Sequence, residues 1–172
     1  MPKKAPLILT LQPDLESQAF FDAQRKLYFP PERNLLSAHL TLFHQLPNQP
    51  EVHQQLKSLK LNAFDMEVKG LINLGAGVAY RIESDVLLML RKELATAFNA
   101  FLIPQDRHGF RPHITIQNKT SPETARQLIS DLSGTFKSFN VRATGLSLWV
   151  YEGGPWTFKS HFSFDEFKQE RP

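Results

Sequence analysis

Hydrophobic positions along the chain fall into short apolar runs separated by longer amphipathic stretches. The short runs, such as residues 7–11 and 113–117, are typical of strands. The longer stretches have apolar residues near helical spacing, and Ser84 and Ser121 precede two of them in the position of an N-cap. The pattern predicts strands at residues 7–11, 38–44, 64–74, 78–82, 113–117, 141–151 and 156–164, and helices at residues 14–28, 50–59, 85–101 and 122–132.

The predicted elements form an internal repeat. The order strand, helix, strand, helix, strand begins at Leu7 and begins again at Val78. Solenoid repeats have units of roughly 20–50 residues, so this longer unit indicates a duplicated lobe. We expect an α+β fold of two pseudo-twofold-related lobes, each with a largely antiparallel sheet and outer helices, around a central cleft. Residues 1–172 would form a single bilobal domain, with repeats at about 7–74 and 78–149 and a final strand at 156–164.

The composition is that of an ordinary globular protein, with 41% hydrophobic and 22% charged residues. The absence of cysteine excludes disulfides and thiolate metal sites, and it fits a reducing compartment. No segment reaches the ~18 apolar residues of a membrane span, and the first apolar run is too short for a signal peptide. We therefore expect a cytoplasmic, monomeric protein without a membrane partner. The net charge of +3 is compatible with a phosphate-bearing ligand.

Two predicted strands carry the same motif, a histidine followed two residues later by a threonine. The motifs are His39 with Thr41 and His113 with Thr115, and they stand at matching places of the two repeats. Side chains alternate across a strand, so each histidine shares a face with its threonine. The opposite face carries aliphatic side chains, which are Leu40, Leu42, Ile114 and Ile116. A half-buried strand has no structural need for this pairing, which indicates a site.

These residue types suit chemistry at a phosphate. Imidazole takes up or releases a proton near neutral pH, so one histidine on each side of a phosphorus provides a base and an acid. Threonine hydroxyls donate to the non-bridging oxygens, where negative charge must be stabilised. No carboxylate has a spacing that completes a metal site, and the chain has no phosphate-binding glycine loop. Neither a metal nor a cofactor is therefore expected.

The two motifs resemble the signature of the two-histidine (2H) phosphoesterase superfamily, and within it the 2′-5′ RNA ligase and RNA 2′,3′-cyclic phosphodiesterase branch. That signature is a histidine, a hydrophobic residue, a threonine or serine and a second hydrophobic residue, found twice. The likeness extends from Leu7 to Phe164 and includes Arg111-Pro112 before the second motif, whereas Ser37-Ala38 before the first motif departs from it.

The resemblance implies a bilobal α+β fold in which both motifs face a central cleft. It implies metal-free opening of the 2′,3′-cyclic phosphates of RNA or nucleotide ends, or the reverse 2′-5′ ligation of RNA. His39 and His113 would then be the catalytic residues, Thr41 and Thr115 would bind the phosphate, and RNA ends or cyclic-phosphate nucleotides would be the partners. Which histidine is the acid and which the base stays open, because a reversible reaction exchanges the roles.

Residues beside the motifs are candidates for substrate binding. Arg111 shares the face of His113 if the strand starts early and would then meet a phosphate, and the alternative is a solvated strand-end arginine. Phe43 lies on the face of His39 by alternation, where a place in the core is favoured over stacking on a base. By the same alternation, His44 faces away from His39 and stays outside the catalytic pair.

Tyr151 and Trp156 flank a predicted turn at residues 152–155. An aromatic pair beside a cleft is suited to stacking on a nucleobase, although it serves equally to attach the hairpin to the core. Two other functions stay open from the sequence. One is a non-catalytic RNA- or nucleotide-binding protein that uses the same cleft, and the other is a cyclic phosphodiesterase for a small nucleotide metabolite.

Overall fold

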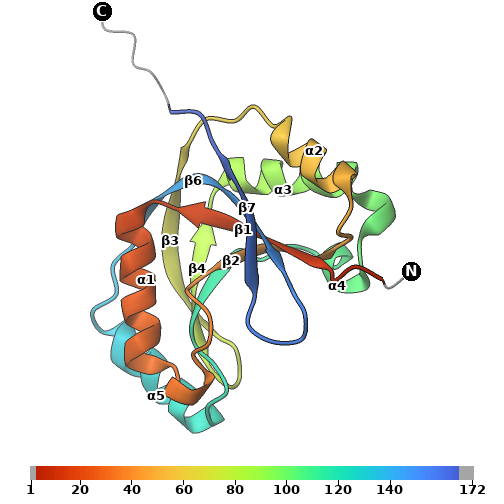
Figure 1. The fold of residues 1–172 in the computed structure, drawn as a ribbon. Helices are drawn as coiled ribbons and strands as arrows, with labels where there is room; N and C mark the ends of the chain where they lie inside the picture. The colour runs from red at the N-terminus through yellow and green to blue at the C-terminus, as the bar shows by residue number, and fades with distance from the viewer. Residues whose placement is uncertain (1–2, 167–172) are drawn as a thin grey trace, which may run out of the picture.

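A computed structural model describes residues 3–166, and in this range seven strands form one antiparallel sheet (Figure 1). The strands are β1 (Leu7–Pro13), β2 (Leu40–Leu46), β3 (Phe64–Asn73), β4 (Val78–Glu83), β5 (His113–Gln117), β6 (Phe139–Val150) and β7 (Thr157–Ser163). The helices are α1 (Leu15–Tyr28), α2 (Pro50–Lys57), α3 (Asp85–Ala97), α4 (Pro104–Arg107) and α5 (Pro122–Ser133), with 3-10 turns at Pro31–Arg33 and Asn99–Phe101. The predicted α+β class is confirmed.

The strand order within the sheet is β2-β1-β6-β3-β4-β5, and β7 pairs with β6. Exchanging each strand of the first predicted repeat with its counterpart in the second (β1 with β4, β2 with β5, β3 with β6) gives the same order read backwards. The sheet therefore has the symmetry that a duplication requires, with the pseudo-twofold axis between β3 and β6. Each repeat contributes its third strand to the other half of the sheet. The repeat limits at residues 7–74 and 78–149 stay a prediction.

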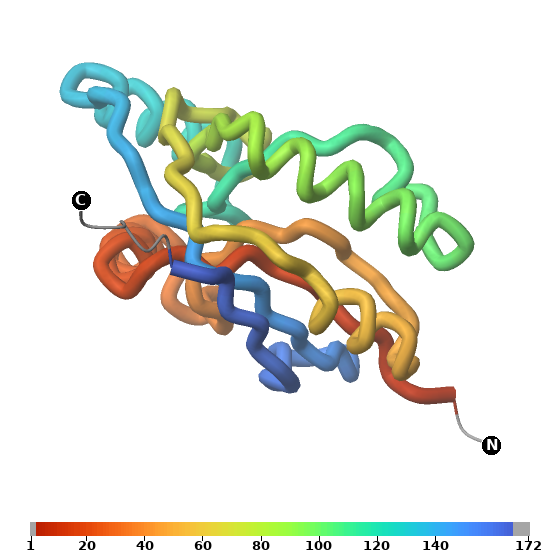
Figure 2. The backbone as a smooth tube through the Cα atoms, turned by 90° about the horizontal axis from the view of Figure 1, so that it is seen from above, coloured from red at the N-terminus to blue at the C-terminus, as the bar shows by residue number. Residues whose placement is uncertain are grey.

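The helices follow the same symmetry. Helices α1 and α5 lie toward one end of the molecule and α2 and α3 toward the other, and the two helices of each pair are separated across its width (Figure 1 and Figure 2). Each pair combines one helix from each predicted repeat. The sheet between them curls, so that β2 and β5, which stand at the two ends of the strand order, contact each other. Both strands carry a histidine motif.

Leucine side chains of β1 and β6 form the centre of the core. In the antiparallel ladder Leu9 pairs with Leu148 and Leu11 pairs with Leu146, and all four side chains are buried. Burial of one leucine side chain contributes about 1.5–3 kcal/mol to folding. This ladder fixes β1, which is the strand against which β2 and the first histidine motif are aligned.

All the predicted elements are present, but most of their ends differ by one or two residues from the prediction, since β1 ends at Pro13, α2 ends at Lys57 and β6 begins at Phe139. Strand β2 begins two residues later than predicted. The helix predicted at residues 85–101 ends at Ala97 and is followed by a separate 3-10 turn. Helix α4 was not predicted, because four residues are too few to show a periodicity. The hydroxyl oxygens of Ser84 and Ser121 accept backbone N–H groups as N-caps, as predicted. None of the helices between residues 3 and 166 is long and apolar enough to cross a membrane.

Gly77 lies where β4 begins against the backbone of β5, and an added Cβ would collide with the carbonyl group of Gln117. We expect Gly77→Ala to lower the free energy of unfolding by about 1–3 kcal/mol, because the two strands must separate to admit a methyl group. Urea denaturation measures this change. The control is Gly154→Ala, whose added Cβ meets no atom within 4 Å. Equal free energies of unfolding for the two variants would show that a methyl group at residue 77 is accommodated without separating β4 from β5.

Candidate active site

The two motif histidines stand at the two ends of the curled sheet. His39 directly precedes β2, and His113 is the first residue of β5. Both side chains are half-buried. Because β2 and β5 contact each other, the two imidazoles are close enough for the charge of His113 to affect the protonation of His39. The fold therefore brings the two predicted catalytic residues into one site.

Both imidazoles are fixed in the same way. Nδ1 of His39 lies 2.8 Å from the carbonyl oxygen of Ser37, and Nδ1 of His113 lies 2.7 Å from the carbonyl oxygen of Arg111. A carbonyl oxygen only accepts hydrogen bonds, so Nδ1 carries the hydrogen in each ring and Nε2 is left for a ligand. In both cases the accepting carbonyl group belongs to the residue two positions before the histidine, so the same local backbone geometry orients both rings.

The threonines and aliphatic residues of the motifs follow the predicted alternation. Thr41 and Thr115 are half-buried, and each pairs with a residue of the neighbouring strand, Thr10 and Ala79 respectively. The aliphatic side chains of the two motifs are buried, and these are Leu40, Leu42, Ile114 and Ile116. Each motif thus presents its hydroxyl group on the same face as its imidazole.

His39 is neutral at physiological pH. Its pKa is lowered from 6.5 to about 4, mainly by burial and also by the positive charges of Arg25, His113 and His44, against the opposing effect of the Ser37 hydrogen bond. A neutral ring whose Nδ1 is protonated has a lone pair on Nε2. In the free protein, His39 therefore presents a proton acceptor.

Arg25 is a residue of the site that the sequence analysis missed. Its side chain is buried, with 4% exposed, and Nη1 donates to the carbonyl oxygen of Thr115 at 3.0 Å while Nε donates to Oδ1 of Asn34 at 3.0 Å. The guanidinium group thus ties α1 to the second histidine strand and acts electrostatically on His39. Its position four residues after the buried Phe21, on the apolar face of a helix, was the available signal.

A hollow of about 330 Å³ lies next to His39. Ser37 and Ala38 line one side of it, and Trp149 and Trp156 line another. The ring centroid of Trp156 lies 4.6 Å from that of His39. Trp156 therefore lies at the site, as proposed from the sequence.

Trp149 was not identified from the sequence, although it forms part of this hollow. Its Nε1 donates to the hydroxyl oxygen of Thr10 at 2.9 Å, which fixes the indole ring. Its ring centroid lies 6.3 Å from that of Trp156. The aromatic pair beside His39 is thus Trp149 with Trp156, whereas the predicted pair was Tyr151 with Trp156. Tyr151 lies beyond the end of β6, is exposed and does not line the hollow.

Phe43 belongs to the core and offers no surface for a base. Its side chain is fully buried, its ring centroid lies 5.7 Å from that of Phe98, and the guanidinium carbon of Arg91 lies 4.0 Å from its ring centroid. The candidate role in substrate binding is therefore wrong, and the alternative of a core position, which the sequence favoured, holds.

The guanidinium group of Arg111 is exposed and makes no hydrogen bond or ion pair with any residue of the described range, so its role as a phosphate ligand stays a prediction. Within residues 3–166, no three histidine, aspartate or glutamate side chains gather as a metal site.

The prediction that His44 faces away from His39 is wrong. Strand β2 contains register shifts against β1, at which Leu42 and Phe43 both turn into the core. A bulge of this kind inverts the alternation for the residues that follow. His44 is exposed and lies on the face of Thr41, and its charge contributes to the lowered pKa of His39. Three imidazoles therefore share this face.

Comparison with known proteins gives one family and several similar folds. The family model of the 2′-5′ RNA ligase superfamily matches residues 13–155. The comparison with curated proteins found no match. TT0787 of Thermus thermophilus is similar with a TM-score of 0.65 and 19% identity, over 94% of this chain and 99% of that chain. LigT of E. coli, solved with 3′-AMP, is similar with a TM-score of 0.61 and 16% identity, over 95% and 99%. At these identities the structural likeness concerns the fold.

The lowered pKa of His39 makes stability depend on pH. The folded protein takes up this proton only near pH 4, whereas the unfolded chain takes it up near pH 6.5. The unfolded chain therefore binds this proton before the folded protein does. The free energy of unfolding is unaffected by protonation of His39 above pH 6.5 and falls as the pH is lowered toward 4. We expect the His39 ring signals in an NMR titration to stay unchanged down to about pH 5. We also expect the free energy of unfolding to fall over this window more for the wild type than for His39→Gln. A midpoint near pH 6.5 for His39 would contradict burial as the cause.

Proposed function

Because the chain belongs to the 2′-5′ RNA ligase superfamily, we propose that it opens 2′,3′-cyclic phosphates at RNA or nucleotide ends by metal-independent histidine catalysis. The observation that carries this proposal is the matched anchoring of His39 and His113 through Nδ1, which leaves each Nε2 for a ligand, in two motifs that each carry a threonine two residues later. An acid and a base of equal geometry are what an in-line displacement at phosphorus needs.

In the proposed reaction a water molecule attacks the phosphorus atom of the cyclic phosphate. One imidazole takes a proton from the water through Nε2 while the new phosphorus–oxygen bond forms. The bond from phosphorus to one ribose oxygen breaks, and the other imidazole, which enters the cycle protonated, delivers its Nε2 proton to that oxygen. Ring closure or 2′-5′ ligation is the reverse sequence with the roles exchanged, and the matched geometry of the two motifs suits both directions.

The negative charge of the pentacoordinate phosphorus needs donors and positive potential on the same face. The hydroxyl groups of Thr41 and Thr115 are available as donors two residues after each histidine. The buried guanidinium group of Arg25, bonded behind Thr115, adds a positive charge that is fixed before the substrate arrives. A preorganised charge stabilises the transition state without a cost of reorganisation.

The hollow beside His39 would hold the base of the terminal nucleotide. Its two tryptophans offer flat surfaces for stacking. E. coli LigT, which has a similar fold, has been solved with 3′-AMP and with phosphate. Nucleotide and phosphate binding at the corresponding face of this protein is consistent with the proposal.

We expect His39→Ala and His113→Ala each to lower kcat by about 100-fold or more, because each removes one of the two proton-transfer groups. Turnover of a 2′,3′-cyclic-phosphate oligonucleotide and of cyclic mononucleotides, measured in EDTA, provides the test. His53→Ala removes a half-buried imidazole of α2 outside the site and is the control. Loss of wild-type activity in EDTA would contradict the metal-independent mechanism. Tight binding of the oligonucleotide without opening would favour the non-catalytic alternative.

We expect Trp156→Ala to raise KM about tenfold, since stacking of a base on an aromatic ring is worth roughly 1–3 kcal/mol. Steady-state kinetics on cyclic mononucleotides with different bases measures kcat and KM separately. Tyr151→Ala removes an exposed aromatic ring from the same turn without touching the hollow. If Tyr151→Ala raised KM and Trp156→Ala did not, the base would lie outside the hollow.

A further inference from the structure

His44 is an exposed imidazole on the catalytic face that the proposed reaction does not use. Its side chain is 45% exposed, and it lies beyond Thr41 along β2, on the side away from the hollow at Ser37 and Ala38. The register shifts in β2 put it on this face, as described above. The feature that holds the shifted segment is a buried carboxylate.

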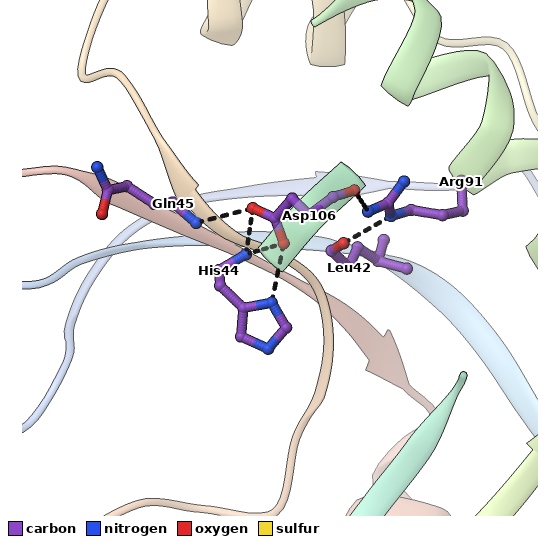
Figure 3. Close-up of polar contacts among 5 residues, drawn as sticks. All are labelled: Leu42, His44, Gln45, Arg91 and Asp106. Atoms are coloured by element: carbon purple, nitrogen blue, oxygen red, sulfur yellow. Dashed lines mark hydrogen bonds and ion pairs between the residues drawn. The ribbon is translucent and has the colours of Figure 1, made fainter. Parts of the chain in front are cut away.

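Asp106 of α4 binds this segment of β2 through three groups (Figure 3). Its carboxylate accepts the backbone N–H of His44 at 3.0 Å, the backbone N–H of Gln45 at 3.2 Å, and Nδ1–H of the His44 ring at 2.9 Å. The carboxylate is 1% exposed. Burial acts to raise its pKa, but the hydrogen bonds from His44 and Gln45 outweigh it, so the pKa of Asp106 is lowered and the group is ionised.

Arg91 of α3 completes the arrangement. Nε donates to the carbonyl oxygen of Leu42 at 2.7 Å, and Nη2 donates to the backbone carbonyl oxygen of Asp106 at 2.7 Å (Figure 3). The guanidinium group therefore bonds to the backbones of both β2 and α4. The carboxylate of Asp106 stays available for its hydrogen bonds with β2. Buried polar groups are costly unless they are satisfied, and here they orient one exposed side chain.

The bond to Asp106 sets the tautomer of His44. Because an ionised carboxylate only accepts hydrogen bonds, Nδ1 carries the hydrogen, and Nε2 is turned to solvent as in His39 and His113. The negative charge behind the ring offsets any positive charge on it. The pair therefore attracts a phosphate poorly, whereas Nε2 can form a hydrogen bond with a neutral hydroxyl group, accepting it when the ring is neutral and donating it when the ring is protonated.

The position of His44 selects which hydroxyl group it can meet. Five residues of straight strand span about 16 Å, and bulges shorten this distance. A mononucleotide with its phosphate at His39 and its base in the hollow extends in the opposite direction. A chain continuing past the site would run toward His44. In RNA that ends in a cyclic phosphate, the terminal ribose has both oxygens in the ring, so the first free 2′-hydroxyl group belongs to the preceding nucleotide.

We propose that His44, positioned by Asp106, binds the ribose 2′-hydroxyl group of the nucleotide that precedes the cyclic phosphate, so that the substrate is an RNA end rather than a cyclic mononucleotide. This proposal rests on the proposed function. The 2′-hydroxyl group is the feature by which proteins tell RNA from DNA at a given position.

The test uses three substrates that all carry a terminal 2′,3′-cyclic phosphate. They are a mononucleotide, a dinucleotide with ribose in the preceding position, and the same dinucleotide with 2′-deoxyribose there. For the wild type we expect kcat/KM to be about fivefold higher with ribose than with deoxyribose, which is the effect of one neutral hydrogen bond. In His44→Ala this difference should disappear, whereas any effect of the lost imidazole charge on His39 should change the turnover of all three substrates by the same factor. His53→Ala should retain the ribose preference.

A ribose preference that persists in His44→Ala, with or without an equal loss on all three substrates, would overturn the role of His44. If the wild type opens none of them, the proposed function fails. Calorimetry would then measure the affinities of the wild type and His44→Ala for the two dinucleotides. A preference for ribose that is present in the wild type and lost in His44→Ala would support the role of His44, and the lack of such a preference in the wild type would overturn this role.

The positioning role of Asp106 has its own readout. Asp106→Asn keeps the size of the side chain but removes the charge and one acceptor. We expect the ¹⁵N signals of the His44 ring to change from a single tautomer with Nδ1–H to a mixture, and the ribose preference to weaken. An unchanged tautomer together with a reduced preference would contradict orientation by Asp106.

Discussion

The antiparallel pairing of β3 with β6 is the contact on which the placement of both histidine motifs depends. It joins the half β2-β1-β6 to the half β3-β4-β5, so each motif stands at the outer end of its own half. The curl of the sheet then brings the two ends into contact. Residues of the two histidine motifs therefore meet at one face of the molecule with matching anchoring of their imidazoles.

Two buried cationic side chains support this arrangement in different ways. Arg91 donates its hydrogen bonds to backbone carbonyl groups and holds the irregular part of β2. Arg25 is bonded to Thr115 and Asn34 but forms no ion pair in the described part of the chain. A buried charge costs free energy unless an opposite charge compensates it. The carboxylate of Asp22 acts electrostatically on Arg25 and provides part of this compensation.

The sequence was most informative where one local rule decides the outcome. Strand β5 has the predicted bounds, and Ser84 and Ser121 cap their helices as expected, because alternation and capping depend on neighbouring residues. Simple alternation failed at His44, since it assumes a regular strand and β2 is bulged. The bulge is held by Asp106, a residue 62 positions away from His44 in the chain. No local pattern reports such a contact.

The sequence by itself determined the α+β class, the order of strands and helices, the two histidine motifs and the family, because periodicity and motif spacing are properties of the chain. Only the tertiary structure decided that the repeats exchange their third strands, that Arg25 lies behind Thr115, that Trp149 lines the hollow, and that a third imidazole joins the face. These features depend on pairing between distant strands and on which polar groups find partners when buried. Both the pairing of distant strands and the partners of buried polar groups are determined by packing in three dimensions rather than by neighbouring residues in the chain.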